Sequence, residues 1–549
     1  MGWRTWLVVF STAFLALFAQ IYTTVAAPSI IAFIVRDVGS PDLSIWVIQA
    51  PLLIQAALNP LLGRLSDVVS RKMLAIVPAL LALAGSILSA KANGMVMLIG
   101  GGILYGTALA TISIVQTIPA EILPRKYRAL SNGISFLGGS TGALAGVFLS
   151  GYFSVHPNGW RNTFWVQAGL YALVIIFIFG FYWPVKRSEP VKKSWREILW
   201  DCDPIGATMF VAGSTGTLMA LNWASGSYTW SNPRVYTTLV VGLVILLAFG
   251  LYEWKGRNDG LVAHVFFRAG RNFPLALFSM MIEGWIFYSA INNITPQMHL
   301  YLGWASDSLK ISIRQLAYQI PSIVASLPII WYSTKYKDVK TPNVIGFAMF
   351  LATASAYAAI RPEWKHAQLA IAFIGGTGQA APLTLLISIV QFTAPHKFLS
   401  NATGLAFSIR AIGGAFGSAV LYTIINGTLR SDYGPHVAGA ATGAGLAPDQ
   451  IPAFMAVMAG GNGPPTLDEL IAVMSKAVPS ASVAAISAAQ NASHEVYAKA
   501  YRMAWASIVP FAFLALASVS YLKSVKAFMT DTVEAPLEPE SGEGDFEKQ

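Results

Sequence analysis

The sequence contains a single cysteine, Cys202, among 549 residues. A secreted domain stapled by intrachain disulfide bonds is therefore excluded. Charged residues make up only 11% of the chain, whereas soluble proteins carry about 25%, which argues against a soluble enzyme. Neither a Gly-x-x-x-x-Gly-Lys-Ser/Thr phosphate-binding loop nor a His-Glu-x-x-His motif occurs, so ATP-driven pumping and zinc hydrolysis have no visible machinery. A membrane enzyme is only a distant alternative.

Long apolar stretches dominate the chain. Apolar residues make up 55% of it, and the mean hydropathy is +0.57. Because a helix of about 20 apolar residues crosses a bilayer, each run of this length predicts a span. Fourteen such runs occur, near residues 5–34, 44–63, 73–91, 95–119, 131–153, 163–183, 205–222, 236–254, 273–300, 312–332, 343–360, 366–390, 402–425 and 503–523. The sequence therefore predicts an all-α polytopic membrane protein.

The basic residues are distributed unevenly between the loops. The net charge is +10, but the lysines and arginines lie in short clusters between apolar runs, so no nucleic-acid-binding domain is predicted. If the chain starts in the cytoplasm, about 23 of the 36 basic residues fall on that side. The positive-inside rule therefore predicts a multi-pass protein with both termini in the cytoplasm. We expect a monomer in the lipid bilayer, with no cofactor and no metal ion.

The sequence repeats itself. The stretch Ile-Ser-Ile-Val-Gln occurs at 112–116 and again at 387–391. At a constant offset of 271 residues, further positions match: Pro124 with Pro395, Lys126 with Lys397, Tyr127 with Phe398, Gly133 with Gly404, Gly142 with Gly413, and Gly146 with Gly417. We interpret this as a duplication that gives two six-helix bundles, 1–185 and 273–528, with loops and two inserted helices in 186–272. Such bundles enclose a central cavity, and rocking them opens it to each side in turn, whereas a channel would need a selectivity filter that is not visible here.

Two segments fall outside the apolar runs. Residues 427–502 are rich in Ala, Gly and Pro, and they are predicted to form a long extracellular loop. The sequons at Asn426 and Asn491 make both residues glycosylation candidates, although chance occurrence explains such short motifs equally well. The acidic, proline-containing tail 529–549 is predicted to be disordered.

The loop after the second predicted helix reads Gly63-Arg64-Leu65-Ser66-Asp67-Val68-Val69-Ser70-Arg71-Lys72. Gly63 permits close helix approach, Asp67 can accept charge-assisted hydrogen bonds, and the basic pair fixes the loop at the cytoplasmic face. Alternatively, these basic residues only follow the positive-inside rule, as they do in any loop between two spans. The spacing resembles the signature loop of the major facilitator superfamily, which implies two pseudo-symmetric six-helix bundles plus two extra central helices. The resemblance also implies a conformational-switch role for five residues: Gly63, Arg64, Asp67, Arg71 and Lys72.

Small residues recur one turn apart on the fifth predicted helix, where they allow another helix to pack at backbone distance. They are Gly138, Gly139, Gly142 and Gly146, and the second half repeats two of them as Gly413 and Gly417. The stripe resembles the glycine-rich motif of antiporters in this superfamily, but its proline is absent, because Ala143 follows Gly142. Generic helix packing is the alternative interpretation.

Nearly the whole chain resembles fourteen-helix fungal carriers of the trichothecene-efflux and siderophore-transporter group. Besides the features above, the resemblance rests on Glu121-Ile122-Leu123-Pro124, Arg128 and Trp160-Arg161. It implies a cell-membrane secondary active transporter that exports a small amphipathic metabolite, toxin or drug in exchange for protons. Proton-coupled uptake of a siderophore-iron complex is the nearest alternative. A nutrient sensor is disfavoured, because such sensors usually carry long cytoplasmic extensions, whereas the two cytoplasmic tails expected for this chain are short.

Two residues depart from the pattern of fourteen-helix drug and proton antiporters. An Asp that is frequent in the first helix of such carriers is replaced by Ala19, and an Arg that is frequent in the fourth is replaced by Gly102. Because Ala19 and Gly102 have no ionisable side chain, these two positions cannot couple transport to protons.

Only two ionisable residues lie deep inside predicted spans, Glu283 in the ninth and Arg410 in the thirteenth. An ionisable group in the bilayer core is costly, so it is functional or paired. Each lies about ten residues from the cytoplasmic end, roughly 15 Å deep at 1.5 Å per residue. We therefore predict that the two face each other and couple transport to protons, with a fixed structural ion pair as the alternative.

Substrate contacts are expected from polar and aromatic side chains on the helices that line a central cavity, since such pockets are mainly apolar with a few placed hydrogen bonds. Core packing or lipid contact is the alternative for each. The candidates are Gln49, Gln55, Trp285, Tyr288, Asn292, Asn293, Tyr318, Gln319 and Gln379.

Overall fold

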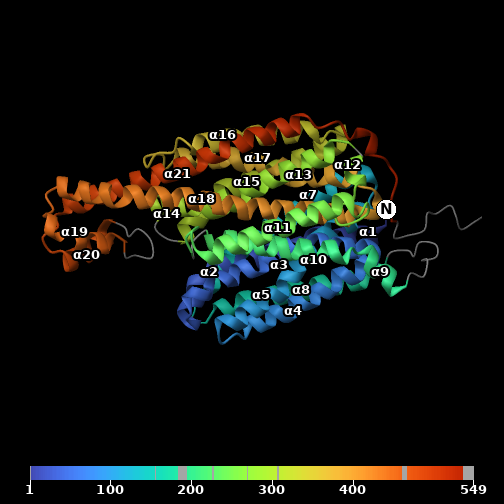
Figure 1. Cartoon of the computed structure of the whole chain (residues 1–549), viewed down its shortest axis with the longest axis horizontal. Coiled ribbons are helices and arrows are strands. Elements are labelled where there is room, and N and C mark those ends of the chain that lie inside the picture. Colours follow the sequence, from blue (N-terminus) through green and yellow to red (C-terminus); the bar gives the residue numbers. More distant parts are fainter. Residues whose placement is uncertain are drawn as a thin grey trace, which may run out of the picture.

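The protein is a bundle of long helices that lie side by side (Figure 1). The computed structural model describes residues 2–154, 156, 158–183, 194–224, 228–268, 270–305, 308–459 and 467–535. No strand occurs among these residues, so the predicted all-α class is confirmed.

The N-terminal half contains α1 (Trp3–Val9), η1 (Phe10–Ala16), α2 (Leu17–Val38), α3 (Pro41–Val68), α4 (Arg71–Ala90), α5 (Met95–Leu109), α6 (Ile112–Ile122), η2 (Arg125–Tyr127), α7 (Arg128–Ser154) and α8 (Trp160–Phe181). The middle segment contains α9 (Trp195–Asp201), α10 (Pro204–Asn222), α11 (Pro233–Lys255) and α12 (Val265–Arg268). The C-terminal half contains α13 (Asn272–Gly284), η4 (Trp285–Ile294), α14 (Thr295–Tyr301), α15 (Ser308–Tyr336), α16 (Lys340–Tyr357), α17 (Ala367–Thr393), η5 (His396–Phe398), α18 (Leu399–Gly443), η6 (Pro448–Gln450), α19 (Ile451–Ala459), α20 (Leu467–Ala477), α21 (Val483–Ser520) and η7 (Lys526–Phe528).

Local capping signals fix several helix starts. The Ser70 side chain accepts a hydrogen bond from Met73 N at the start of α4, and Ser482 accepts one from Ala485 N at the start of α21. At α10, Asp203 accepts from Gly206 N and is followed by Pro204 in the first helical position. Such residues satisfy the unpaired backbone donors of a first turn, and proline has no donor to lose there.

Helices occur at all fourteen predicted positions, some of them as two or three consecutive elements. Within the described ranges, twelve helices are long and apolar enough to cross a membrane. The two that fall outside this set are α15 and α16, which pack against α17 and α21 inside the C-terminal half. A multi-pass membrane protein is therefore established, and the count of fourteen spans stays a prediction.

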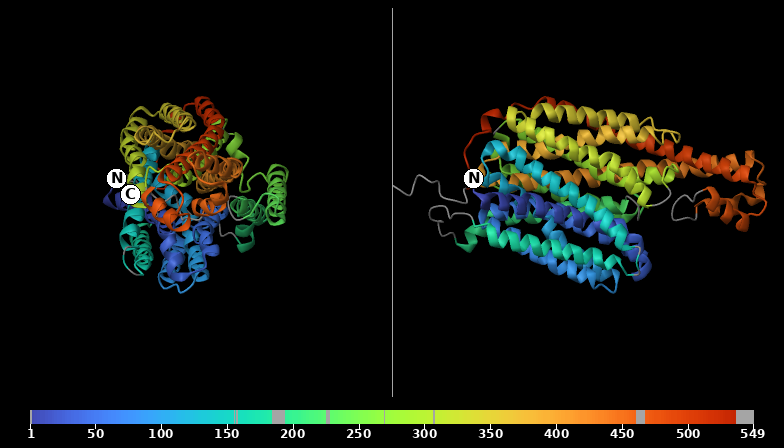
Figure 2. Two further views of the ribbon diagram at one scale, coloured as in Figure 1. Left: turned by 90° about the vertical axis from the view of Figure 1, so that its left-hand side faces the viewer. Right: turned by 180° about the vertical axis from the view of Figure 1, so that it is seen from behind.

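The predicted duplication is visible in the packing. Gly133 of α7 lies against Ile330 of α15, and the matching Gly404 of α18 lies against Asn59 of α3. Asn59 and Ile330 are separated by the same 271 residues as the two glycines, so one offset relates both sides of this contact. The two halves are thus pseudo-symmetric, and α10 with α11 lies to one side of them (Figure 2).

The glycine stripe of α7 packs as close helix contacts require. Gly138, Gly142 and Gly146 meet the backbones of Phe14, Phe18 and Tyr22 in turn, while Gly139 meets the Ile21 side chain. The stripe therefore joins the fifth predicted helix to the first.

The corresponding glycines of α18 make the equivalent contacts in the second half. Gly413 meets the backbone of Met281, and Gly417 lies against the indole of Trp285. They join the thirteenth predicted helix to the ninth.

The expectation of a long loop at 427–502 is wrong. Asn426 lies inside α18, which continues to Gly443, and α21 begins at Val483, so both helices project beyond the rest of the bundle (Figure 1). With α19 and α20 they enclose a small apolar core of their own, which includes Phe454, Leu470 and Met474. The segment is Ala-rich, and alanine has the highest helix propensity, which explains the helices. Asn426 and Asn491 are both exposed on this helical extension, and their glycosylation stays a prediction.

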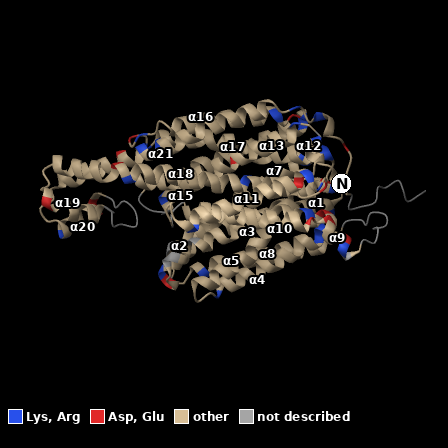
Figure 3. Cartoon of the chain, viewed as in Figure 1, with Lys and Arg blue, Asp and Glu red and all other residues tan. Residues whose placement is uncertain are grey.

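Charged side chains gather at the two ends of the bundle, and the middle is almost free of them (Figure 3). We call the end that carries residues 63–72, 121–128, 396–401 and 529–535 the tail face, and the opposite end the extension face. Both the N-terminal helix and the last described residues lie at the tail face (Figure 2). A chain whose two termini lie at the same face crosses between the faces an even number of times, and the predicted topology requires this.

Candidate functional site

The signature loop holds the two halves together at the tail face. Asp67, at the end of α3, accepts hydrogen bonds from the backbone of α18 in the other half: Ser400 N lies 3.3 Å from its Oδ1, and Asn401 N lies 2.9 Å from its Oδ2. These amides belong to the first turn of α18, where the helix dipole favours a negative charge. Asp67 therefore caps a helix of the opposite half.

Close backbone contact accompanies this cap. A Cβ atom added at Gly63 would lie 2.5 Å from Ser400 O, and one added at Gly404 would lie 2.6 Å from Asn59 O. Ser408 Oγ also donates to Ala56 O across the same interface, at 2.7 Å. The α3 and α18 helices can meet at this distance only because glycine stands at both positions.

An ion-pair network extends the junction. Arg71 Nη2 donates to Asp67 Oδ1 at 2.8 Å, and Arg71 also pairs with Glu121 at the end of α6. His396 Nδ1, from the other half, lies 3.0 Å from Glu121 Oε1 and 3.0 Å from Glu534 Oε2. Three ligand atoms of Glu121, His396 and Glu534 lie within 4.8 Å of one another, as in a metal site, but both carboxylates already face guanidinium groups. We therefore interpret the cluster as an ion-pair network between the halves.

The remaining residues of the signature loop bind neighbouring segments. Arg64 Nε donates to Asp201 O at 2.9 Å and its Nη2 donates to Asp259 O at 3.0 Å, so it joins α3 to the segments that flank the inserted helices. Lys72 Nζ donates to Phe179 O at 3.2 Å and lies over the Trp183 ring. The structure thus places all five signature-loop residues in contacts that fix the tail face.

A buried charge cluster lies inside the C-terminal half, at the place predicted for it. Glu283 of α13 is 0% exposed and Arg410 of α18 is 4% exposed. The Arg410 guanidinium binds Glu283 through two nitrogens, Nε on Oε2 and Nη2 on Oε1, the latter at 2.9 Å. Gly284 permits this approach, since its Cα faces the Arg410 backbone directly.

Three further side chains complete the cluster. Gln379 Nε2 donates to Glu283 Oε1 at 2.5 Å, and Tyr318 Oη donates to Gln379 Oε1 at 2.9 Å. Arg410 Nη1 donates to Tyr288 Oη at 2.8 Å, and the guanidinium lies over the Phe287 and Tyr288 rings. Tyr288 belongs to η4, a π-helical stretch of the kind that often marks functional sites.

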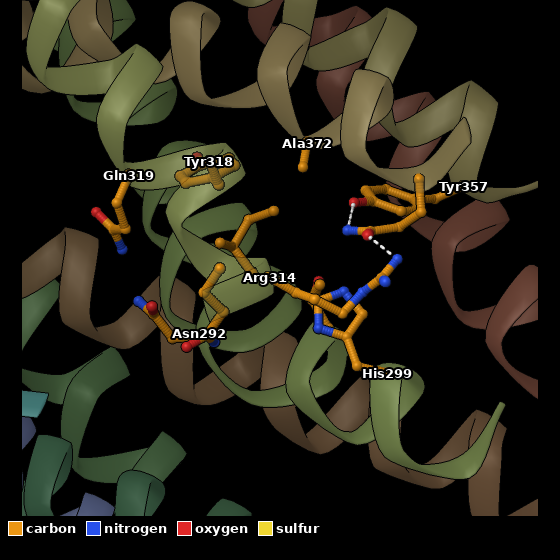
Figure 4. Close-up of a pocket in the computed structure, with 11 residues that line it drawn as sticks. Asn292, His299, Arg314, Tyr318, Gln319, Tyr357 and Ala372 are labelled. Carbon is orange, nitrogen blue, oxygen red and sulfur yellow. Dashed lines mark hydrogen bonds between the residues drawn. The ribbon is translucent and has the colours of Figure 1, made fainter. Parts of the chain in front are cut away.

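A small cavity adjoins this cluster (Figure 4). Tyr318 belongs to both, because its ring lines the cavity and its hydroxyl binds Gln379. The cavity is lined by Ile291, Asn292, Thr295, His299, Arg314, Gln315, Tyr318, Gln319, Tyr357, Gln368 and Ala372. Asn292 and Gln319 point toward each other across it, and Gln368 joins Arg314, at 2.9 Å, to Tyr357, at 3.3 Å (Figure 4).

The residues that were predicted to contact the substrate lie at several different places in the structure. Asn292, Tyr318 and Gln319 line the cavity, while Tyr288 and Gln379 belong to the charge cluster. Trp285 does not line this cavity: it is 1% exposed and packs between Phe416 and Phe511, because Gly417 leaves room for the indole. Asn293 is exposed and binds Ser418 Oγ at 3.5 Å. Gln49 and Gln55 lie on α3 and do not line this cavity.

Sequence reasoning missed two basic residues of the cavity, His299 and Arg314. His299 is 0% exposed, and neither ring nitrogen has a hydrogen-bond partner within the described part of the chain. Both residues lie near the ends of predicted spans, at 300 and 312, where polar residues are ordinarily attributed to the membrane surface. One cavity is lined by His299, Gln315 and Gln319, and these residues come together only because α14 packs against α15 in the folded chain.

Two pseudo-symmetric helical bundles that are joined at one face form the architecture of many membrane carriers. The profile of the Major Facilitator Superfamily matches residues 12–418, so the chain belongs to that superfamily and is a transporter, not an enzyme.

Fungal transporters resemble the chain along most of its length. The MFS-type transporter ucsD of Acremonium sp is 23% identical over 441 residues, covering 78% of this chain and 72% of the relative. The MFS-type efflux pump MMF1 of Pseudozyma antarctica is 25% identical over 460 residues, with 79% and 80% covered. Among solved structures, the proton:xylose symporter XylE aligns with a TM-score of 0.54 at 11% identity over 78% of this chain and 90% of its own. The human organic anion transporter MFSD10 aligns with 0.51 at 14% identity over 77% and 93%. The structural likenesses show the fold.

Proposed function

We propose that this transporter exports a small amphipathic metabolite, toxin or drug in exchange for protons. One observation carries the proposal: a fully buried carboxylate, Glu283, is joined through Gln379 and Tyr318 to a cavity. A carboxylate in the membrane interior is costly and is by default functional or paired. Glu283 is paired with Arg410 and Gln379, and Tyr318, which binds Gln379, lines the cavity.

The arrangement links the protonation of Glu283 to substrate binding at Tyr318. While Glu283 is ionised, Arg410 and Gln379 are held by it, and Gln379 in turn holds the Tyr318 hydroxyl. Protonation of Glu283 weakens its bonds to Arg410, because a charge-assisted bond is stronger than a neutral one. A substrate that binds Tyr318 withdraws that hydroxyl from Gln379. The proton and the substrate thus act on one hydrogen-bonded chain, and such linkage between the two sites is what a proton-coupled carrier needs.

Tail-face contacts supply the other part of the mechanism. Asp67, Arg71 and His396 hold this face closed in the conformation described, so we expect a substrate to enter or leave from the extension face. Release of these contacts opens the tail face and reverses the access. The efflux-pump name of one fungal relative supports export, with the tail face in the cytoplasm of the cell.

We expect substrate flux to follow the proton gradient. A deletion strain is expected to retain intracellularly a metabolite that wild-type cells export, and metabolite profiling of cells and medium identifies it. In proteoliposomes with an acidic lumen, purified protein is then expected to accumulate this metabolite, and a protonophore is expected to abolish the accumulation. If the protonophore leaves the accumulation of the metabolite unchanged, transport is not coupled to protons. Loss of iron-dependent growth on a siderophore would favour uptake instead.

A further inference from the structure

The first residues of the C-terminal tail do not follow the predicted disorder. Residues 529–535 dock onto the tail face, while 536–549 lie outside the described residues. Met529 is 1% exposed and anchors the segment next to η7. Lys337 Nζ, at the end of α15, donates to Met529 O at 2.8 Å. The tail therefore leaves the C-terminal half from a fixed point.

From there the tail crosses to the N-terminal half. Four main-chain hydrogen bonds pair it with the segment around η2: Lys126 N to Thr530 O, Arg125 N to Thr532 O, and the amides of Glu534 and Ala535 to Glu121 O, with distances of 2.9, 3.1, 3.2 and 3.1 Å respectively. An extended peptide that adds its backbone to an exposed edge is a recurring recognition mode, in which main-chain bonds supply affinity.

Side-chain charges match along this contact. Arg128 Nη2 donates to Glu534 Oε2 at 2.7 Å, Arg125 Nε lies 3.5 Å from Oε1, and Lys126 pairs with Asp531. His396 Nδ1, from the C-terminal half, lies 3.0 Å from Glu534 Oε2. The Glu534 carboxylate thus binds Arg128 of the N-terminal half and His396 of the C-terminal half, so residues 529–535 connect the two halves at the tail face.

Glu534 stays ionised over the whole physiological pH range. Burial would raise its pKa, but the hydrogen bond with His396 and the nearby guanidinium groups of Arg128 and Arg125 outweigh burial and lower the pKa to about 2. Because the folded-state pKa lies below the ordinary value, the contribution to stability is complete above about pH 4.5 and is lost only as the pH falls toward 2.

We propose that the surface formed by Glu121, Arg125, Arg128 and His396 is a groove for an extended acidic peptide, and that its occupant is this chain's own tail, 529–535. The tail is covalently part of one half and hydrogen-bonded to the other, so it acts as a latch on the closed tail face. Opening that face separates Arg125 and Arg128 from the C-terminal half, which pulls the tail out of its groove. The latch thereby controls how often the transporter opens.

The latch is tested on the full-length protein in lipid nanodiscs, without any substrate or proton gradient. In a Cys202→Ala background, spin labels at exposed Val69 and Tyr336 report the distance between the halves at the tail face. Glu534→Lys is expected to raise amide hydrogen exchange in 530–535 by roughly tenfold or more, the ratio that corresponds to a lost charge-assisted hydrogen bond. It is also expected to lengthen the distance between the labels. Asp449→Lys makes the same charge change at an exposed residue of η6, on the helical extension, and it is expected to alter exchange in 530–535 less than about twofold.

Two outcomes would overturn the latch. Unchanged exchange in Glu534→Lys would show that the groove does not hold the tail through Glu534. Faster exchange with an unchanged label distance would show that the tail is docked but does not hold the halves together. Glu534→Gln, which keeps the shape of the side chain, replaces the lysine variant if that variant fails to fold, and the same outcomes apply. None of these results depends on proton coupling, so failure of the latch is distinguishable from failure of the proposed function.

Discussion

Replacement of Glu283 by glutamine is expected to abolish the dependence of transport on the proton gradient. Glutamine cannot carry the charge that Arg410 neutralises, and it has no titratable proton to exchange. Removal of one partner of a buried ion pair typically costs about 3–5 kcal/mol, because the other charge stays buried. We therefore expect the single variant to lose stability as well, which a thermal unfolding measurement in detergent detects.

A double variant separates coupling from stability. Glu283→Gln with Arg410→Gln removes both charges, so most of the lost stability is expected to return while proton dependence stays absent. Lys499→Gln is the control, because its pair with Asp432 is partly exposed and is expected to contribute little to stability. If the double variant is stable and still follows the proton gradient, Glu283 does not couple protons and its pair with Arg410 is structural.

The second large effect is expected at Gly63. A Cβ there would lie 2.5 Å from Ser400 O, so Gly63→Ala keeps α3 and α18 apart at the tail face. Overpacking of this kind costs roughly 1–3 kcal/mol, which corresponds to about a 5- to 150-fold shift away from the closed conformation. Since each transport cycle passes through that conformation, we expect flux of the exported metabolite in proteoliposomes to fall by about tenfold or more.

The control for Gly63 is a glycine with open space around it. A Cβ at Gly169, on α8, meets no atom of the described residues within 4 Å, so Gly169→Ala is expected to leave flux unchanged. Gly404→Ala introduces the clash from the other half and is expected to match Gly63→Ala. Full flux in both Gly63→Ala and Gly404→Ala would mean that close contact between α3 and α18 is not part of the cycle.

Much of this architecture was accessible from the sequence, because its physical causes are local. Apolar runs locate the helices, and the repeated glycines identify where helices touch. The Glu283 and Arg410 pairing followed from equal depth, since two opposite charges in a bilayer core have few other partners. The helical extension was missed because a segment that carries many Gly and Pro residues reads as a loop. Its abundant alanines favour helix nevertheless, and its own apolar core around Phe454 stabilises the helices.

Other features depend on groups that meet only in the folded chain. The cavity draws His299, Arg314 and Gln368 from three separate helices. The docked tail has an acidic, disorder-prone composition, and only the assembled edge at Arg125 and Lys126 gives its backbone a partner. Asp67 accepts a hydrogen bond from Ser400 N, which lies 333 residues later in the sequence. No local pattern encodes such contacts.

Alternating access is tested most directly by two distances in one protein. Spin labels at Val69 and Tyr336 span the tail face, and labels at exposed Val96 and Glu363 span the extension face. Glu283→Gln imitates the protonated state and is expected to lengthen the first distance while it shortens the second, relative to the unchanged chain. If both distances stay fixed, or if both change in the same direction, the two halves do not rock about a central cavity.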